Sequence, residues 1–303
     1  PNPCTCDFTL NDPTGLFNDR NPNSIYYGKL PPYTPVRFSV TEDRSFAILD
    51  TTEGCEVKTT DKAVLDITGD IDIRIEFEFD DPSDGVTGYL LASKYRRTAS
   101  ANRSWLLGLT AEGNIRLTWT TDGSAATITS ADSTVAVDLT GTPLAVRATL
   151  DVNDGSGNHV ARFYTADTIS ASWTQLGAAV TAAGVTSIFS STADVELGRV
   201  DDGANGGISG LTGLYGRIYG FELYSGIAGT LVAEADIYNQ AHGTTSFSDG
   251  LATPNTWTTE GTAEITPDNR RFTGELSSMP IEWEASGNDV YVTAQAADIT
   301  RRL

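Results

Sequence analysis

Three carboxylates with a spacing of two residues follow one another in Glu76-Phe-Glu-Phe-Asp-Asp. In an extended strand this spacing places Glu76, Glu78 and Asp80 on one face. Two carboxylates that flank a glycosidic bond can hydrolyse it, one as the acid and the other as nucleophile or base. The alternation with Phe77 and Phe79 is also what the solvated face of a half-buried sheet gives. We interpret the three carboxylates as such a solvated face and predict no catalytic residues.

Carboxylates and amides also gather in three turn-like segments, where they offer oxygen ligands to a hard cation. Calcium takes six to eight oxygens. None of the segments has the helix–loop–helix calcium pattern, and Asp, Asn and Gly are common in ordinary hairpin turns. The sequence therefore favours turn chemistry, and calcium is the alternative cofactor. The candidate calcium ligands are Asp80, Asp81, Asp84, Asp151, Asp154, Asp201 and Asp202.

Aromatic and basic side chains outside clear strand patterns are the candidates for glycan binding. Trp173 and Trp257 lie in Ser- and Thr-rich surroundings, which predicts exposed rings able to pack on a sugar. Tyr95, Arg96 and Arg97 begin a basic, aromatic loop in an otherwise acidic chain. That loop suits an anionic glycan, but an ordinary solvated loop is the favoured interpretation.

The charge balance narrows the classes of partner. Among 303 residues, 40 are acidic and 20 are basic, which gives a formal net charge of -20. Such a charge repels phosphate backbones and anionic membranes at long range, and no apolar run is long enough to span a membrane. We therefore predict neither a nucleic-acid nor a membrane partner. Cysteine and histidine are too few for a disulfide framework or a zinc site, and Cys4, Cys6 and Cys55 are predicted to be unpaired.

Most of the chain alternates apolar and polar residues in short segments separated by turn signatures. The clearest strand is Ile71 to Phe79. Its alternation places five apolar side chains on one face: Ile71, Ile73, Ile75, Phe77 and Phe79. Trp105 and Trp119 fall in further strand patterns and are predicted to be core. Repeated strands with Gly- and Asn-rich turns predict a two-sheet antiparallel sandwich or barrel. Within the central part of the chain only residues 230–240 have helical spacing, and residues 296–303 have it at the end of the sequence.

The central part of the chain resembles the concanavalin A-like, or laminin G-like, jelly-roll domains. The resemblance rests on residues 59–77, on residues 105–119, and on Glu196-Leu-Gly-Arg followed by Gly216-Arg-Ile-Tyr-Gly-Phe-Glu-Leu-Tyr. It implies an all-β jelly-roll sandwich over residues 46–268. The glycanases of this fold carry a further Glu shortly after the second carboxylate of the strand, and this chain has none at that spacing after Asp80.

The two ends of the chain look like two halves of one small β unit. Residues 1–45 and residues 269–303 each contain a few apolar alternations, such as Val36, Phe38 and Val40 in the first half. Neither half has enough strands to be stable alone, but together they can close a small sheet or barrel. We therefore predict a split β domain into which the jelly roll is inserted.

These flanks resemble the tail-tip, or minor tail, proteins of long-tailed bacteriophages of Gram-positive, especially actinobacterial, hosts. The matching segments are Cys6-Asp-Phe-Thr-Leu-Asn-Asp-Pro-Thr-Gly-Leu-Phe in the first half, and Arg271-Phe-Thr-Gly-Glu-Leu-Ser-Ser-Met-Pro-Ile-Glu-Trp and Asp289-Val-Tyr-Val-Thr-Ala-Gln in the second. In some members a laminin G-like domain separates the two segments. One departure is Asn11-Asp-Pro-Thr-Gly, where the family usually carries an Asn-Asn-x-Asp-Gly-like turn.

The resemblance implies a structural, non-enzymatic virion component, located extracellularly at the phage tail tip or baseplate. Its partners would be other tail proteins, and a homo-oligomeric state in the assembled tail stays open. The inserted module would bind a host-surface glycan. The alternative from another class is a secreted or cell-surface adhesin or glycanase of the concanavalin A-like fold.

Overall fold

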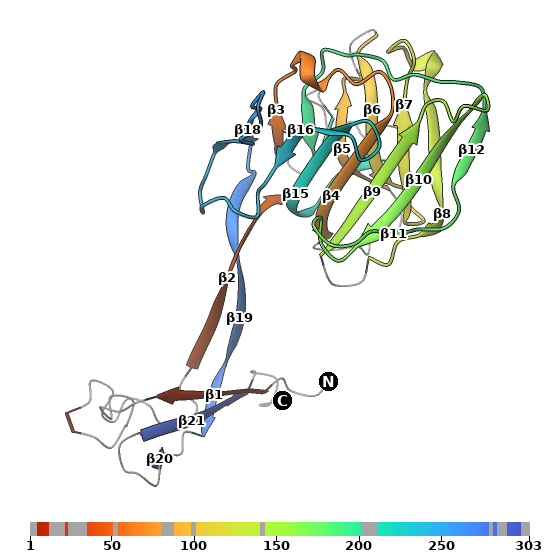
Figure 1. Ribbon diagram of the computed structural model, residues 1–303. Coiled ribbons are helices and arrows are strands. Elements are labelled where there is room, and N and C mark those ends of the chain that lie inside the picture. Colours follow the sequence, from red (N-terminus) through yellow and green to blue (C-terminus); the bar gives the residue numbers. More distant parts are fainter. Residues whose placement is uncertain are drawn as a thin grey trace. The chain divides into compact units, whose positions relative to one another are not determined.

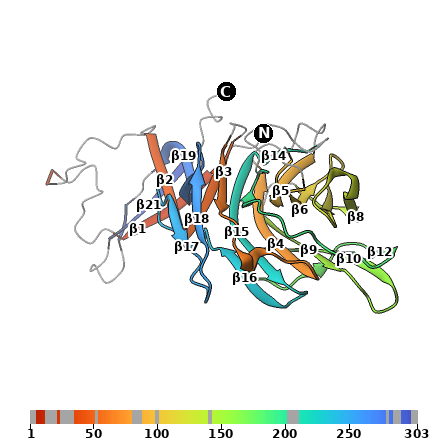
Figure 2. The ribbon, with the colours of Figure 1, turned by 90° about the horizontal axis from the view of Figure 1, so that it is seen from above.

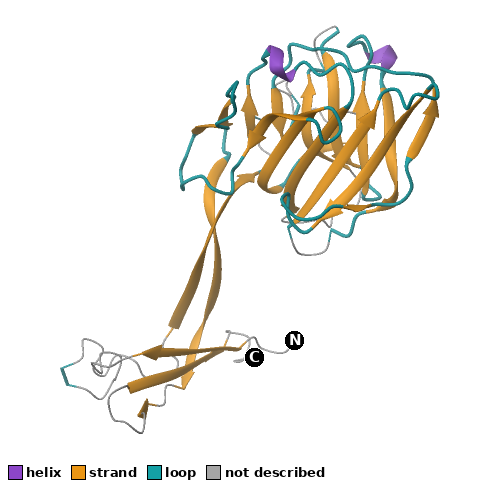
Figure 3. Cartoon of the chain, in the orientation of Figure 1, coloured by secondary structure: helices purple, strands orange, loops and turns teal. Residues whose placement is uncertain are grey.

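The computed structural model shows an all-β protein with two antiparallel sheets, which confirms the predicted jelly-roll fold class (Figure 3). The chain divides into two compact units. One consists of Pro1–Glu42 and Asn269–Leu303, and the other is Asp43–Asp268. The structure describes residues 5–11, 22–23, 35–50, 54–79, 88–97, 101–139, 143–200, 211–278, 281–283 and 290–297.

The split unit contains strands from both ends of the chain. The C-terminal strand β21 (Val290–Ala297) pairs antiparallel with β1 (Thr5–Asn11) over seven residues, from Thr5↔Ala297 to Asn11↔Tyr291. It also pairs with β20 (Ile281–Trp283) and with β19 (Glu264–Ser278). In the strand order β19 is the neighbour of β2 (Pro35–Leu49), the strand that contains Phe38. The N-terminal and C-terminal segments therefore share one sheet.

In the larger unit, the first sheet has the order β2-β15-β4-β9-β10-β11, with β16 paired to β15 and β12 paired to β10. Figures 1 and 2 show β4, β9 and β10 in one layer and β5, β6 and β7 in the other. The strands of the first sheet that follow β2 are β4 (Ile71–Phe79), β9 (Leu144–Asp151), β10 (Asn158–Ala166), β11 (Thr174–Gln175), β12 (Val180–Ala183), β15 (Gly216–Ser225) and β16 (Thr230–Ala235).

The second sheet has the order β17-β18-β3-β13-β5-β6-β7-β8, and β14 pairs in parallel with β5. Two short 3-10 helices, η1 (Ala63–Leu65) and η3 (Ala125–Thr127), accompany the sheets. The strands of this sheet are β3 (Glu56–Thr59), β5 (Gly88–Tyr95), β6 (Arg103–Leu109), β7 (Asn114–Trp119), β8 (Thr129–Ala136), β13 (Val195–Leu197), β14 (Leu211–Gly213), β17 (Ser246–Ser248) and β18 (Thr256–Glu260).

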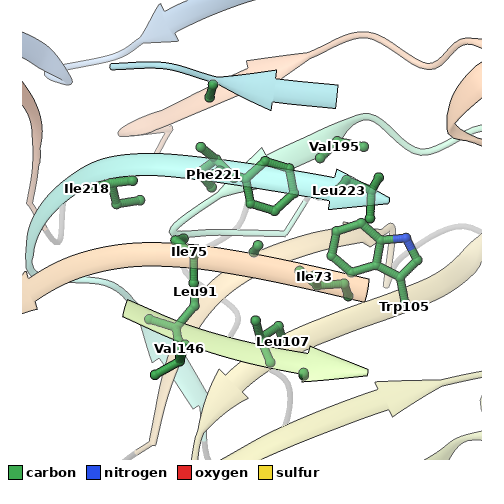
Figure 4. Packing of buried hydrophobic residues seen from close by; sticks show 14 of the residues in the cluster. Ile73, Ile75, Leu91, Trp105, Leu107, Val146, Val195, Ile218, Phe221 and Leu223 are labelled. Atoms are coloured by element: carbon green, nitrogen blue, oxygen red, sulfur yellow. The ribbon is translucent and has the colours of Figure 1, made fainter. Parts of the chain in front are cut away.

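The core lies between the two sheets and follows the period-two pattern of the strands. Ile73 and Ile75 of β4 are buried together with Trp105 and Leu107 of β6, as Figure 4 shows. Trp119 of β7 is also buried, so both tryptophans predicted to be core are confirmed. Because alternate residues of β4 point into this layer, the polar residues between them face away from the core.

The predicted helical segment over residues 230–240 is wrong. Thr230–Ala235 is strand β16. It pairs with β15 from Phe221↔Ala235 to Ser225↔Thr230, with a bulge between Leu223 and Tyr224. The hydrogen bonds offered by the edge of β15 override the weak helical preference of this short segment.

Cys55 is buried and unpaired, as predicted, whereas Cys4 and the side chain of Cys6 lie outside the described residues. No helix within the described part of the chain is long and apolar enough to cross a membrane.

Candidate functional site

The outer face of β4 is covered around Asp72 and Glu76, so the prediction of a solvated face is wrong for Glu76. Glu76 is 3% exposed, and Asp72 on the same face is fully buried. Backbone N–H groups of two covering segments reach these carboxylates: Ile169 donates to Glu76 Oε2 at 2.9 Å and Ala228 to Asp72 Oδ2 at 3.1 Å. The face that sequence periodicity assigns to solvent is therefore a covered polar layer.

The next carboxylate along β4 has a different environment. Glu78 accepts hydrogen bonds at its Oε2 atom from Arg217 Nη1 at 3.0 Å and from Tyr219 Oη at 2.7 Å. Both donors satisfy the Oε2 atom of Glu78 at the surface of the sheet. Glu78 does not line the cleft described next. Asp80, the third carboxylate of the predicted face, lies outside the described residues.

A cleft of about 510 Å³ opens beside Glu76. Its walls come from β4, β15, β16, the residues just after β16, and the segment 168–170 between β10 and β11. Four carboxylates line it, and they come from three strands and the loop after β16: Glu76, Glu222, Glu234 and Asp236. Thr168, Ser170, Asn239, Tyr219 and Tyr238 also line the cleft.

A bulge in β15 shapes the floor of the cleft. Ile218 pairs with Phe77 and Gly220 pairs with the next residue of β4, Glu76, so β15 has one extra residue between these two pairs. A Cβ atom placed on Gly220 would lie 3.7 Å from the Ala235 carbonyl oxygen and 3.7 Å from the Ile169 side chain. Glycine thus leaves this part of the floor open without any positive φ being required.

Glu76 is the most unusual group in the cleft. Its Oε2 atom has the Ile169 N–H, whereas its buried Oε1 atom has no hydrogen-bond partner among the described residues. Burial raises the pKa of Glu76, and the Ile169 hydrogen bond and the charge of Arg44 only partly oppose this. A buried carboxylate oxygen without a donor is costly, so a hydrogen-bond donor that reached this atom would relieve that cost.

The other carboxylates of the cleft differ in their neighbours. Glu222 Oε2 accepts from Arg74 Nη1 at 3.1 Å and from Tyr224 Oη at 2.8 Å. Burial and this bond to Glu222 raise the pKa of Tyr224 to about 12. For Glu234, burial and the charges of Asp236, Glu222 and Asp249 all raise the pKa. The cleft therefore contains negative charge that its own lining leaves partly uncompensated.

The ring candidates from the sequence lie elsewhere. Trp257 and Tyr95 are buried, so the prediction that Trp257 is exposed is wrong, and neither ring is presented to a ligand. Trp173 is half-buried, with its ring centroid 5.9 Å from Arg74 Cζ. Arg96 and Arg97 are half-buried rather than fully solvated. None of these candidates lines the acidic cleft.

The calcium candidates that the structure describes behave as turn residues. Asp154 Oδ1 accepts the N–H groups of Ser156 at 2.7 Å and Asn158 at 3.0 Å, and Asp151 Oδ1 accepts that of Asn153 at 3.1 Å. Within the described residues no group of three or more His, Cys, Asp or Glu side chains could hold a metal ion. The remaining candidates lie outside those residues: Asp80, Asp81, Asp84, Asp201 and Asp202.

Sequence reasoning missed most of the cleft. Glu234 and Asp236 lie in the middle of the segment 230–240 that was predicted to be helical, and the segment 168–170 has no pattern that marks it. A signal existed for Glu222, which alternates with the core residues Phe221 and Leu223 in β15.

Comparisons with known proteins give only structural likenesses of low sequence identity. No family model and no curated protein matches the chain. A Bacteroides ovatus protein assigned to carbohydrate binding is 11% identical with a TM-score of 0.48, over 76% of this chain and 60% of that one. The CBM40 of Ruminococcus gnavus IT-sialidase bound to alpha2,3 sialyllactose is 14% identical with a TM-score of 0.40, over 63% and 92% of the two chains.

A SAP-like pentraxin from Limulus polyphemus is 10% identical with a TM-score of 0.39, over 78% of this chain and 97% of that one. The chain spans less than two thirds of the Bacteroides ovatus protein and nearly the full length of the other two. Because these three TM-scores are below 0.5, the likenesses carry no argument about what this chain binds.

Proposed function

We propose that this chain is a non-enzymatic component of a bacteriophage tail tip or baseplate, in which the inserted unit binds a host-surface glycan. The observation that carries the glycan-binding part is the buried Oε1 atom of Glu76, which lines an open cleft and has no donor among the described residues. A sugar hydroxyl is a donor of the kind that this oxygen lacks.

The rest of the cleft is suited to a sugar. Its volume of about 510 Å³ lies in the range of small-molecule sites. Tyr238 is 41% exposed and lines the cleft, so its ring offers an apolar surface beside a set of acceptors. Thr168, Ser170 and Asn239 supply hydroxyl and amide groups that can donate or accept hydrogen bonds with a polyhydroxylated ligand.

The tail-tip part of the proposal rests on the resemblance of the two flanks to minor tail proteins. What supports it physically is the insertion itself, because both ends of the chain belong to one unit and enclose the other in sequence. In this arrangement the split unit docks with other tail proteins and the inserted unit is displayed at the virion surface.

A glycan array probed with the full chain tests binding, with and without added calcium. Tyr238→Ala should weaken binding to any positive glycan by about tenfold, the scale of one lost aromatic contact. Tyr215→Ala is the matched control, since Tyr215 is also 41% exposed but does not line the cleft. An array without any positive glycan, or equal binding by Tyr238→Ala and wild type, would refute binding in this cleft.

Two further measurements separate the alternatives. Release of reducing ends from a bound glycan, abolished by Glu76→Gln, would replace binding with glycoside hydrolysis. Mass spectrometry and immunogold microscopy of purified particles of the encoding phage test the tail role. We expect the chain at the tail tip, and its detection only on or outside bacterial cells would favour an adhesin.

A further inference from the structure

The charged side chains that line the acidic cleft in the described part of the chain are all negative. Among the residues that the structure describes, its lining contains four carboxylates and no Lys, Arg or His side chain. One of the four, Glu222, has an ion pair with Arg74 at 3.1 Å. Among the described residues, Glu76, Glu234 and Asp236 form no ion pair, although the charge of Arg44 on β2 acts on Glu76. Any ligand in the cleft therefore meets a net negative field.

That field excludes one class of glycan and leaves two. A sialylated or uronic acid ligand would bring a second carboxylate beside Glu76 and Glu234, and like charges in a desolvated site repel strongly. A neutral sugar would give Glu76 Oε1 its missing hydrogen bond but would leave the negative charge uncompensated. An ammonium group supplies both the missing hydrogen bond and the compensating charge, because it carries three donors and a positive charge.

A metal ion is a poorer occupant than an organic cation. No group of three or more His, Cys, Asp or Glu side chains in the described parts of the chain is arranged to hold one. The cleft also presents the exposed ring of Tyr238, and an ammonium group near an aromatic face gains a cation–π attraction. Asp236 is held by Asn239, whose Nδ2 atom donates to both of its oxygens at 3.1 and 2.9 Å. Asp236 is thus positioned by a neutral amide, and among the described residues only Glu222 of the four carboxylates has an ion pair.

We infer that the cleft selects a glycan that carries a free amino group, with the ammonium placed against the unpartnered oxygen of Glu76 in the negative field of the other carboxylates of the lining. This inference rests on the proposed glycan-binding function and specifies its ligand class. The net charge of -20 adds a long-range attraction for such a ligand that salt should screen.

The titration of the cleft gives an independent expectation for binding. Burial raises the pKa values of Glu76 and Glu234, so their charge is complete only at a higher pH than for a solvated carboxyl group. Arg44 opposes this at Glu76, whereas Asp236, Glu222 and Asp249 add to it at Glu234. Affinity for an amino-glycan should therefore rise as the pH increases from about 4.5, for as long as the amino group of the sugar keeps its proton, while a neutral glycan should lack this rise.

Calorimetric titration of the full chain with three tetrasaccharides tests the inference. The ligands are a glucosamine oligomer, its N-acetylated counterpart and a galacturonate oligomer. At mildly acidic pH, where the glucosamine amino groups are protonated, we expect the amine to bind at least about tenfold more tightly than the N-acetylated oligomer, the scale of one charge-assisted hydrogen bond, and the galacturonate not to bind. Raising the salt concentration should weaken only the amine.

Glu76→Gln makes the test specific to this site. Glutamine keeps the size of the side chain and a carbonyl oxygen for the Ile169 N–H, but it removes the charge. We expect this variant to lose the preference for the amine, so that its affinities for the amine and for the neutral oligomer differ by less than about threefold. Glu112→Gln, which changes an exposed carboxylate in a turn far from the lining, is the control and should leave all affinities unchanged.

The outcomes separate this inference from the proposed function. Equal or tighter binding of the neutral oligomer would overturn the amine preference and leave glycan binding in place. Tight binding of spermidine, equal to that of the glucosamine oligomer, would show that the sugar contributes nothing and would also overturn the inference. Failure of all three oligomers together with an empty glycan array would refute both.

Discussion

Asp72 is expected to hold the covered face of the first sheet together, and Asp72→Asn should destabilise the larger unit strongly. Arg147 donates to its two oxygens from Nε at 2.9 Å and from Nη2 at 2.8 Å. Arg74 does the same from Nε at 3.2 Å and from Nη2 at 3.1 Å. The Asp72 side chain is 0% exposed, and those of Arg147 and Arg74 are 13% and 15% exposed.

The magnitude follows from the burial of these charges. Removal of one partner from a buried ionic group costs about 3–5 kcal/mol, because the remaining charge stays buried without compensation. Asparagine can still accept one hydrogen bond from a guanidinium, so we expect about 3 kcal/mol, at the low end of that range. For a unit of this size, that corresponds to a decrease in melting temperature of about 6–12 °C.

The effect should also depend on pH. Burial acts to raise the pKa of Asp72, but hydrogen bonds from Arg147 and Arg74 and their positive charges outweigh it, so the pKa lies below its usual value. A carboxyl group with a lowered pKa in the folded state stabilises the fold above its unfolded-state pKa and loses this contribution as the pH falls through the folded-state value. The difference between wild type and Asp72→Asn should therefore be largest near neutrality and shrink in acid.

Thermal and urea unfolding monitored by tryptophan fluorescence measures the difference. The matched control is Asp132→Asn, because Arg116 and Asp132 form the same two-pronged pair at 2.6 and 2.6 Å with side chains that are 34% and 40% exposed. An exposed pair of this kind contributes at most about 1 kcal/mol. If Asp72→Asn costs no more than Asp132→Asn, or if its cost does not fall in acid, the reasoning from burial is refuted.

Three further predictions concern single positions. Gly123→Ala should cost more than about 2 kcal/mol in urea unfolding, because φ is +80° and a Cβ would lie 2.6 Å from the carbonyl carbon of Ala101, whereas Gly155→Ala, at φ +76° in open space, should cost only the backbone strain of about 1–2 kcal/mol. Without ligand, Glu76→Gln should raise the unfolding free energy at neutral pH by about 0.5–2 kcal/mol, because burial raises the pKa of Glu76 and its charged form opposes folding. This gain in stability should vanish below pH 4.5, the ordinary pKa of the group, and a destabilised variant would contradict the reasoning. Cys55 should react with a thiol reagent only after unfolding, because it is buried and burial raises its pKa, so rapid labelling in the native protein, located by peptide mass spectrometry, would be inconsistent with its position.

The fold was predictable because its main signal is local. The alternation of Ile71, Ile73 and Ile75 with polar residues fixes which side of β4 faces the core, and all three are buried. The periodicity does not reveal what covers the opposite side. Segments far away in the sequence supply the N–H groups of Ile169 and Ala228 that reach that side, so their arrival depends on tertiary structure.

The candidate site was less predictable for the same reason. Glu76 attracted attention as a possible catalytic residue of one strand, yet its neighbours in the cleft come from other strands and loops. Glu234 and Asp236 were hidden because the short segment around them has helical spacing, and only the free edge of β15 makes it a strand. Trp257 was misjudged because Ser- and Thr-rich surroundings are as compatible with β18, where the ring is buried, as with an exposed loop.

The cleft also links ligand binding to stability, because the Oε1 atom of Glu76 affects the stability of the free protein and is the atom to which the ligand donates. In the free protein, the charge of Glu76 is buried with one oxygen lacking a donor, which opposes folding. A ligand that donates to this oxygen binds the folded state alone and stabilises it by mass action. Glu76→Gln should therefore start from a higher melting temperature than wild type and gain less when the amino-glycan is added. A variant that gains as much as wild type would show that the ligand does not reach Glu76, whatever its affinity.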